Sequence, residues 1–403
     1  MSQEPLYQRT VEDSKVVIAH AKLDEDELCP VTQAIYLGDT MKSLRLMEIP
    51  QNILNEIKQG NRVLFRGTTD DTPVLCTQSQ TFQVKEAETS NSLNLLPSLM
   101  FPDHPHIVNK TEEGIDRKLV RQNIQGIYYT YLELKPCKPR FTKLTSILQE
   151  STYVDHILEN KLAKDTRKLY TMCELLNEIQ SSETELEKEL RTRNAGLIGG
   201  RIRTLEHDYN FRMISHILNL VDSNSWPLDQ IDLSETKSTL EELVPSEIVE
   251  FLFKHYMLVT EGKTKENGEP YYCLIEDKIC RLIGEALLRP TEKFILSEFL
   301  SVWQSSVPEG LTTSLKQLDG IAFVRHSSKP VVVQYFPEVN LSEDIKTRVD
   351  QLFQVQERWT LDDIRPYIEC LATEKVNVNA LLTKYARASN EGGTRYFSSR
   401  LGR

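Results

Sequence analysis

Short alternating or β-branched runs dominate the first 135 residues of the chain and predict strands. One apolar-periodic stretch, from Pro50 to Gln59, interrupts them and predicts a helix. Residues 85–120 are polar and contain prolines, which is typical of a connection, and Ile127–Leu134 alternates as one more strand. The other predicted strands are Lys15–His20, Ala34–Leu37, Leu44–Ile49, Val63–Phe65, Val74–Thr77 and Thr81–Val84. So few short strands predict an incomplete β-barrel whose open edge needs a partner to cover it.

Helical periodicity takes over from about residue 140 and then recurs. Apolar helices begin near residues 172, 240, 294 and 361, at steps of 68, 54 and 67 residues, and each is followed by a second helix and by strands. The clearest unit has a short helix at Ser314–Leu318 and then two strands, Ile321–Arg325 and Val331–Phe336, across a tight turn. A repeated helix–helix–hairpin unit predicts a tandem winged-helix array. A coincidental string of helices and strands is the alternative.

These patterns predict an α+β chain, with an N-terminal incomplete β-barrel followed by a tandem winged-helix array. Ser238 before Glu241 and Thr360 before Asp363 have the spacing of helix caps, and Pro290 ends the helix before it. The predicted domains are a β-rich partner-binding domain at 1–135, a first winged-helix unit at 140–235, a second winged-helix region at 236–355 and a C-terminal winged helix at 356–403.

The last predicted unit carries a basic helix. Its first helix, Thr360–Leu371, has one apolar stripe with steps of three and four residues. A second helix near Asn379–Ala388 buries its own apolar residues. At 100° per residue, Lys384 and Arg387 then lie side by side on the opposite face.

A basic hairpin is predicted to follow this helix. A glycine turn leads into a strand at Thr394–Ser399, with Arg395 at its start and Arg400 and Arg403 beyond. The charge from Val376 onward is +5 − 1 = +4, although the whole chain carries 48 − 59 = −11. A basic helix with a basic wing is the pattern that winged helices use to grip DNA phosphates. A solvated basic tail would show the same charges.

Composition excludes several classes of protein. Of 403 residues, 39% are apolar and 27% are charged, as in ordinary globular chains. No apolar run reaches the length of a membrane span, and the first residues lack the apolar core of a signal peptide. Seven cysteines without metal or redox spacing indicate reduced thiols in the cytosol or nucleus.

Motifs for catalysis are weak. Gly262–Thr264 matches the end of a phosphate-binding loop, but Met257 stands where the loop needs a glycine. Gly196–Gly200 lacks dinucleotide-binding spacing and reads as a turn, and His104–His106 lies in a proline-rich loop. We therefore expect a protein that is not an enzyme and has no cofactor and no metal.

Longer segments resemble a known family, the Dcc-one sister-chromatid-cohesion proteins, which are accessory subunits of the alternative, chromosome-transmission-fidelity eighteen type of replication factor C clamp loader. The matching segments are Val74–Pro97, Asn194–Trp226, Asp277–Leu288, Val302–Ile321, Arg358–Tyr367 and Ala380–Ser389, together with the ending RYFSSR.

The resemblance implies an N-terminal region that folds together with chromosome-transmission-fidelity protein eight and the tail of protein eighteen into a joint barrel. It implies a non-enzymatic nuclear subunit, without a membrane partner, that helps to load the sliding clamp during replication and supports cohesion. Contact with the small replication factor C subunits would run through the large subunit, and contact with the clamp would be indirect. A link to the catalytic subunit of DNA polymerase epsilon is also implied.

The resemblance further implies that the last of the winged helices, usually counted as three, binds single- and double-stranded DNA. The positions that match its basic residues are Lys384, Arg387, Arg395 and Arg400. Two alternatives stay open. One is an adaptor whose winged helices bind only protein, and the other is an ATP-dependent enzyme that uses Gly262–Thr264.

Overall fold

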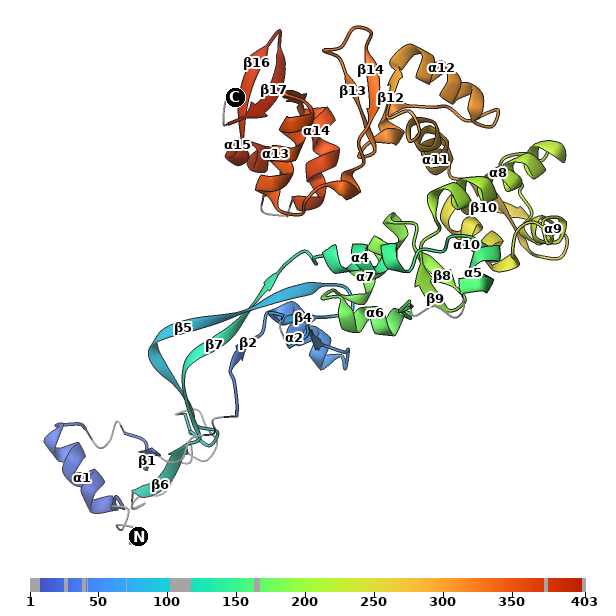
Figure 1. Ribbon diagram of the computed structural model, residues 1–403. Helices are drawn as coiled ribbons and strands as arrows, with labels where there is room; N and C mark the ends of the chain where they lie inside the picture. The colour runs from blue at the N-terminus through green and yellow to red at the C-terminus, as the bar shows by residue number, and fades with distance from the viewer. Residues whose placement is uncertain are drawn as a thin grey trace. The chain divides into compact units, whose positions relative to one another are not determined.

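The computed structural model has mixed α+β structure, about 40% helix and 27% strand. The structure describes residues 8–24, 28–37, 41, 43–69, 71–101, 117–162, 167–372 and 376–400. Contacts divide the chain into two compact units (Figure 1). Unit 1 consists of Met1–Val63 and Phe82–Pro136, and unit 2 of Leu64–Thr81 and Cys137–Arg403.

Unit 1 is built mainly of strands. Strand β7 lies between β2, which is parallel to it, and β5, which is antiparallel, and β5 and β7 form a long curved ribbon (Figure 1). A separate parallel pair joins β1 to β6. The elements of unit 1 are α1 (Val11–His20), β1 (Val31–Leu37), β2 (Met47–Glu48), α2 (Gln51–Lys58), β5 (Thr81–Leu95), β6 (Lys118–Ile124) and β7 (Gly126–Pro136).

Three predictions for unit 1 were wrong. Lys15–His20 lies in helix α1, because Thr10 and Asp13 form a capping box that starts the helix at Val11. Residues 85–120 do not form a single connection, since β5 continues to Leu95 and β6 starts at Lys118. Most of Leu44–Ile49 is not strand, because only Met47 and Glu48 pair with β7. The predicted helix after Pro50 is confirmed as α2.

The described part of unit 1 contains no closed barrel. Its strands form two separate pairings, and large apolar side chains on them remain exposed. Ile35 and Leu37 of β1 are 55% and 73% exposed, and Tyr129 of β7 is 65% exposed. Exposed apolar side chains on strands are typical of surfaces that pair with another chain, and the predicted partner-binding role of this region stays a prediction.

Unit 2 contains the β3–β4 hairpin and four successive segments, each of which has helices followed by a hairpin. We call these the helix–hairpin segments. The hairpin strands are β3 (Leu64–Arg66) and β4 (Val74–Cys76). Segment one has α4 (Thr142–Glu150), α5 (His156–Leu162), α6 (Met172–Glu178), α7 (Glu183–Thr192), β8 (Gly196–Ile198) and β9 (Arg201–Arg203). Segment two has α8 (His207–Ser223), α9 (Leu233–Thr239), α10 (Ser246–Tyr256), β10 (Met257–Thr264) and β11 (Pro270–Leu274).

The two remaining segments each have a three-stranded sheet. Segment three has α11 (Glu276–Leu288), β12 (Lys293–Ile295), α12 (Leu296–Ser306), the 3₁₀ helix η2 (Leu315–Leu318), β13 (Ala322–Arg325) and β14 (Val332–Tyr335), and the 3₁₀ turn η3 (Glu338–Asn340) follows it. Segment four has α13 (Ile345–Val355), β15 (Arg358–Thr360), α14 (Leu361–Ile368), η4 (Glu369–Leu371), α15 (Val378–Tyr385), β16 (Ala386–Glu391) and β17 (Thr394–Ser399).

Helix caps decide where some of these elements begin. Leu240–Val244 was predicted as a helix but forms the turn between α9 and α10, and both end residues are buried in the core. Ser238 does not cap a helix. Asp232 instead caps α9 by accepting a hydrogen bond from the Glu235 N–H at 3.0 Å. The cap predicted at Thr360 is confirmed, since its hydroxyl accepts from the Asp363 N–H.

The cores of unit 2 do not follow the segment boundaries. One large core contains Ile217 of α8 and Leu252 of α10 together with Phe299 and Trp303 of α12, so segments two and three share it. Segment four has its own core, and Phe323 of β13 inserts into it from segment three. Packing therefore joins α8, which lies in the predicted unit at 140–235, to α10 and α12, which both lie in the predicted region at 236–355.

Gly284 of α11 tests how tightly the shared core is packed. A Cβ at this position would lie 2.9 Å from the Trp303 ring and 2.9 Å from a Leu318 methyl group. Alanine normally stabilises a helix interior by about 1 kcal/mol relative to glycine, but overpacking a core costs about 1–3 kcal/mol. We therefore expect Gly284→Ala to lower the free energy of unfolding, as measured by urea denaturation. Ser305→Ala, at an exposed position of α12, should be nearly neutral, and an increase in stability for Gly284→Ala would contradict the packing.

Candidate nucleic-acid interface

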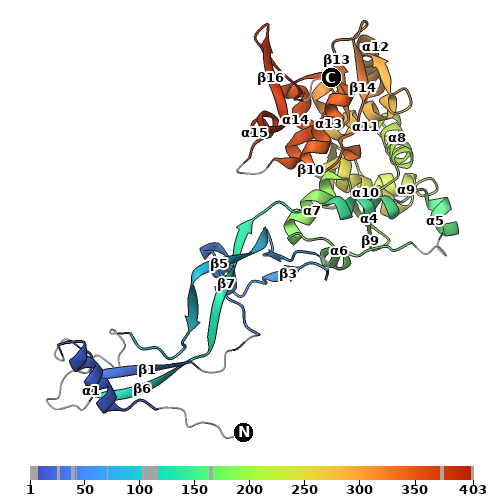
Figure 2. The ribbon, with the colours of Figure 1, turned by 60° about the vertical axis from the view of Figure 1, so that its left-hand side comes forward.

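Segment four ends in a three-stranded antiparallel sheet of order β15–β17–β16. Its edge strand β16 is labelled in Figure 2. The central strand β17 pairs Phe397 with Trp359 on one side and with Ala388 on the other. Paired residues of antiparallel strands share a face, so these three side chains lie on the inner face. Trp359 and Phe397 are fully buried there against the helices. The alternate residues of each strand consequently lie on the outer face.

Helix α15 ends earlier than predicted. It stops at Tyr385, and residues 386–391 pair with 394–399 as β16 and β17, with a turn at Gly392 and Gly393, which both have positive φ. Arg387 was predicted on the helix beside Lys384, and this placement was wrong because β16 takes over at Ala386. Strand pairing with a later segment is a non-local interaction that the helical periodicity of the sequence does not contain.

Two of the four predicted basic residues, Arg387 and Arg400, line one hollow. A shallow hollow of about 400 Å³ is lined by Thr383, Ala386, Arg387, Ala388 and Arg400. Arg400 donates a hydrogen bond to the Thr383 carbonyl at 3.1 Å, one of the last carbonyls of α15. Lys384 follows Thr383 directly and is exposed. The end of α15 and the edge of the hairpin thus place Arg387 and Arg400 at one hollow, and Lys384 is the residue after Thr383, which also lines it.

Arg395 lies apart from this group. It pairs with Asn390 near the tip of the hairpin, on the same face as Phe397, and its guanidinium is 5.1 Å from the Phe397 ring centre. Arg387 is three residues further along the ladder and on the other face, a separation of about 10 Å along the strand. The four residues therefore do not form a single cluster. They are spread from the end of α15 to the tip of the hairpin, with Arg387 and Arg395 on opposite faces, and we call the four together the basic line.

These cationic groups are largely uncommitted. Within the described ranges, the side chains of Lys384, Arg387 and Arg395 make no hydrogen bond or ion pair, and all four basic residues are exposed. An exposed cation without a carboxylate partner is available to a phosphate. Charge-assisted contacts of this kind provide affinity without sequence recognition.

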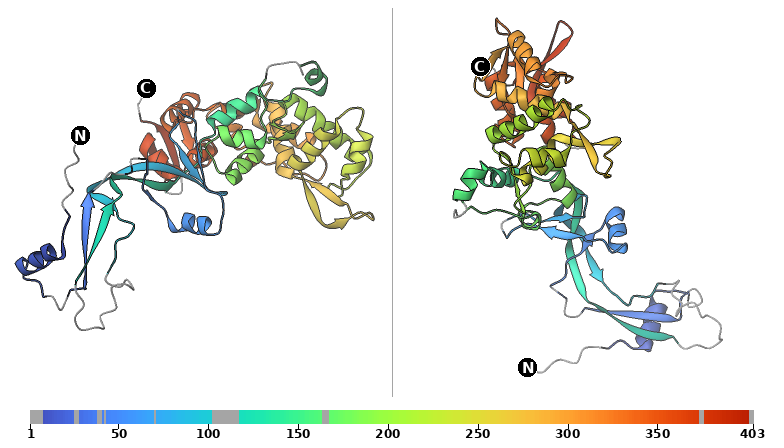
Figure 3. Two further views of the ribbon diagram at one scale, coloured as in Figure 1. Left: turned by 90° about the horizontal axis from the view of Figure 1, so that it is seen from below. Right: turned by 90° about the vertical axis from the view of Figure 1, so that its right-hand side faces the viewer.

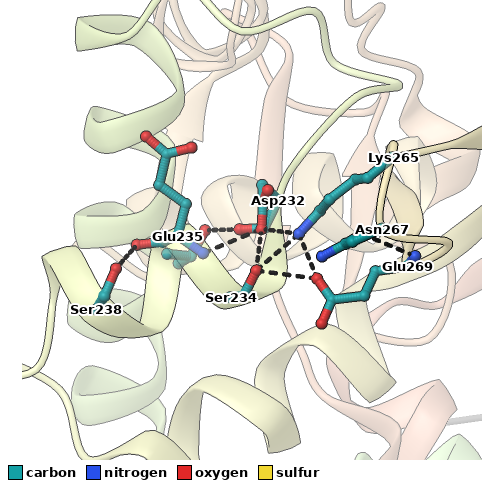
Figure 4. Close-up of polar contacts among 8 residues, drawn as sticks. Asp232, Ser234, Glu235, Ser238, Lys265, Asn267 and Glu269 are labelled. Carbon is teal, nitrogen blue, oxygen red and sulfur yellow. Dashed lines mark hydrogen bonds and ion pairs between the residues drawn. The ribbon is translucent and has the colours of Figure 1, made fainter.

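The hairpin of segment two provides the contrast (Figures 3 and 4). Its Lys265 ammonium is bound by Asp232 Oδ1 at 2.6 Å, Ser234 Oγ at 2.7 Å and Glu269 Oε2 at 2.7 Å. Lys263 forms an ion pair with Asp229 at 2.5 Å. Both lysines of this hairpin are thus neutralised by carboxylates, so the β10–β11 hairpin is a poor phosphate-binding surface although its topology resembles that of β16–β17.

The Lys265 cluster shifts the pKa of its members. Burial opposes ionisation of Asp232, but hydrogen bonds from Lys265 and from the Glu235 N–H outweigh it and hold the Asp232 pKa below its usual value. The Lys265 hydrogen bond also lowers the pKa of Glu269. Burial opposes the charged form of Lys265, yet the hydrogen bonds that Lys265 donates to Asp232 and Glu269 raise its pKa.

Sequence reasoning missed Arg358. It lies on β15, on the outer face, and forms an ion pair with Glu391 near the hairpin tip. Glu391 was counted against the basic charges of the C-terminal region, but Arg358 compensates it. Strand β15 has only three residues and is separated from β17 by more than 25 residues, so the sequence shows no strand pattern there. The one available signal was the β-forming pair Trp359 and Thr360 at the helix cap.

The weaker motifs have structural roles in the described residues. Gly262–Thr264 lies within strand β10 and not at a strand–helix junction. Gly199 and Gly200 form the turn of the β8–β9 hairpin, between two strands and not between a helix and a strand. His104–His106 and Arg403 lie outside the described residues. Among those that are described, no group of three His, Cys, Asp or Glu side chains could hold a metal, and no helix is long and apolar enough to span a membrane.

Comparison with known proteins decides the family. The model of the family "Sister chromatid cohesion protein Dcc1" matches residues 44–368. The mouse sister chromatid cohesion protein DCC1 is 37% identical over 406 residues, covering 99% of both chains, and the human protein is 35% identical over 397 residues, covering 97% of this chain and 98% of its own. The chain belongs to the Dcc1 family. The DCC1 protein of Saccharomyces cerevisiae is 23% identical over 378 residues, covering 89% of this chain.

The family model covers most of the chain but ends before the basic line. The Dcc1 family model ends at residue 368, before α15, β16 and β17, whereas the mouse DCC1 protein is similar over 99% of this chain. The family model therefore does not test the basic residues. The case for Lys384, Arg387, Arg395 and Arg400 rests on their geometry.

Replacing Lys265 should loosen the β10–β11 hairpin. Lys265→Met leaves the Asp232 and Glu269 carboxylates without their cation, so we expect faster amide hydrogen exchange in β10 and β11 at neutral pH.

The effect of this substitution should also depend on pH. Carboxylates with a lowered folded-state pKa stabilise the fold above their unfolded pKa values of about 4, and this contribution disappears as pH falls through the folded-state pKa values. The difference in melting temperature between wild type and variant should therefore shrink from pH 7 to pH 3. Lys254→Met, at an exposed lysine of α10, serves as the control, and a pH-independent difference would count against the ion-pair account.

Proposed function

We propose that this chain serves sister chromatid cohesion as a non-enzymatic subunit of an alternative clamp loader, acting in the nucleus. In this proposal unit 1 assembles with chromosome-transmission-fidelity proteins eight and eighteen, and the complex helps to load the sliding clamp on DNA. Unit 2 links the loader to DNA polymerase epsilon and, through segment four, to DNA. Membership of the Dcc1 family supports the role in cohesion.

The DNA-binding part is carried by one observation: in the described part of segment four, Lys384, Arg387 and Arg395 have no ion-pair partner, whereas segment two pairs its hairpin lysines with carboxylates. The element order of segment four, with a helix, a short strand, two helices and a hairpin, is that of a winged helix. In that arrangement α15 is the second helix of the helix-turn-helix, and β16–β17 is the wing. Lys384 at the helix end and Arg387, Arg395 and Arg400 on the wing would each contact a phosphate.

Binding of this type should be weak and independent of DNA sequence. Only Lys384 of the four residues lies on a helix, and the other three lie on or after the hairpin. Base reading in the major groove needs several polar side chains along an inserted helix. The net charge of −11 also repels DNA over the rest of the chain, so partner subunits would add to the affinity.

Salt-dependent DNA binding tests this proposal. Fluorescence anisotropy of labelled single-stranded and duplex DNA with the full-length chain should show affinity that falls with salt. Changing Lys384, Arg387, Arg395 and Arg400 together to alanine should abolish binding, or make the log–log salt slope shallower by up to ~4 units. The four residues are exposed, so the thermal unfolding of the variant should match that of the wild type.

A charge-matched control separates a specific site from a general charge effect. Alanine at Lys188, Arg191, Lys254 and Lys316 removes the same four charges from exposed positions outside segment four. This control should bind DNA as the wild type does. If the wild type fails to bind at low salt, or if both variants bind equally well, the chain is a protein-binding adaptor and the basic line is not a DNA site.

The partner role of unit 1 makes a separate prediction. Ile35 and Leu37 project from β1 into solvent in the isolated chain. Changing Leu37 to Asp, with Ile35 changed to Ser, should leave the isolated chain as stable as before but abolish its co-purification with the tail of protein eighteen and protein eight after co-expression. Exposed Val339 of η3, changed to Asp, is the control in unit 2. Retention of both partners by the β1 variant would place their contact elsewhere.

A further inference from the structure

We propose that the outer face of the β15–β17–β16 sheet is a stacking platform for the bases of single-stranded DNA. This inference rests on the proposed DNA-binding function. It adds a second surface, which would bind bases, to the basic line, which would bind phosphates. The platform is formed by Tyr396 and Arg358, and Arg387 borders it.

Strand register places these residues together on the outer face. Ser398 of the central strand pairs with Arg358 on one side and Arg387 on the other, and Tyr396 pairs with Thr360 and Ser389. Adjacent strands are about 4.8 Å apart, so the two arginines flank the central strand with a backbone separation of about 10 Å. The face therefore presents an aromatic ring among hydroxyls, with a cation at each side.

Tyr396 and Arg358 already form a layer. The Arg358 guanidinium carbon lies 4.6 Å from the centre of the Tyr396 ring, and the arginine side chain is 47% exposed. A guanidinium that lies over an aromatic ring and is partly exposed can offer its other face to a second flat group. Nucleobases stack on both aromatic rings and arginine planes in single-strand-binding proteins.

The surroundings favour a nucleic acid strand over other ligands with flat groups. Arg387 borders the platform and also lines the hollow that contains Arg400, so a phosphate backbone could continue from the platform to those cations. A duplex keeps its base faces stacked internally, so only a single strand can supply both the base and the adjacent phosphate. A protein partner that uses the same face is a possible outcome of the test and is not the proposal.

Glu391 is the ion-pair partner of Arg358 when no DNA is bound. Its carboxylate binds the Arg358 guanidinium and adds negative charge on the same outer face as Arg387. An approaching phosphate would be repelled by this carboxylate and would compete with it for Arg358. Glu391→Gln should consequently tighten single-strand binding by a few fold, because it removes the competing charge and keeps the side-chain size.

The deciding experiment compares oligo(dT) with an abasic strand of the same length, both labelled and titrated with the full-length chain. The two ligands have the same phosphates, but only the first has bases. The wild type should prefer oligo(dT) by about tenfold, the gain typical of one stacked base. The double variant Arg358→Lys with Tyr396→Leu keeps the net charge and removes both flat groups, so it should bind the two strands equally, with an unchanged salt slope.

Controls make each outcome interpretable. Tyr396→Phe keeps the ring and should keep the preference, and thermal unfolding checks that the double variant is folded. The platform is refuted if the wild type binds both strands equally, or if the double variant keeps the preference. In either case the proposal that the basic line binds phosphates is retained if the variant with all four of its residues changed to alanine has lost affinity for DNA. If the wild type binds neither strand, the proposed DNA-binding function itself fails, and the platform fails with it.

Discussion

The antiparallel pairing of β17 with both β15 and β16 determines the chemistry of the C-terminal segment. One face of this sheet carries Trp359 and Phe397, which are fully buried. The Trp359 indole N–H also donates to the Leu352 carbonyl at 3.1 Å and to the Gln356 carbonyl at 2.9 Å, which fastens the sheet to the end of α13. Because side chains alternate along a strand, burying these rings forces Tyr396 and Arg387 onto the outer face. A shift of one residue would exchange the two faces.

Each helix–hairpin segment of unit 2 contains a hairpin, but the charges around the hairpins of segments two and four are arranged differently. In segment two, Lys265 donates hydrogen bonds to Asp232 and Ser234 at the start of α9 and to Glu269 just before β11. These bonds fix the hairpin to α9. In segment four the corresponding region leaves Arg387 and Arg395 in solvent. An antiparallel hairpin can therefore either have its cations neutralised by nearby carboxylates or leave them available to an anion. The positions of a few carboxylates decide between the two.

Arg348 shows how segment four is attached to the chain before it. This arginine is 4% exposed and donates to the carbonyls of Ser342 and Tyr367 and to the Glu338 carboxylate. Phe323 of β13 reaches the same core as Trp359, with ring centres 4.8 Å apart. A buried cation whose donors are satisfied by carbonyls and a carboxylate imposes one geometry. The start of segment four is thus fixed to segment three through Arg348 and Phe323, whereas the β16–β17 hairpin extends from the other side of its core.

The sequence alone determined the change from strands to helices near residue 136, the helices with long apolar stripes, the cap at Thr360 and the local excess of positive charge after Val376. These features depend on near neighbours and on composition, which a sequence pattern contains. Tertiary structure decided that Arg387 lies on a strand, that Arg358 joins the C-terminal surface and that Lys265 is neutralised while Arg395 is not. Each of these outcomes depends on pairing between residues distant in sequence, and the free energy of such pairing comes from packing that no local pattern records.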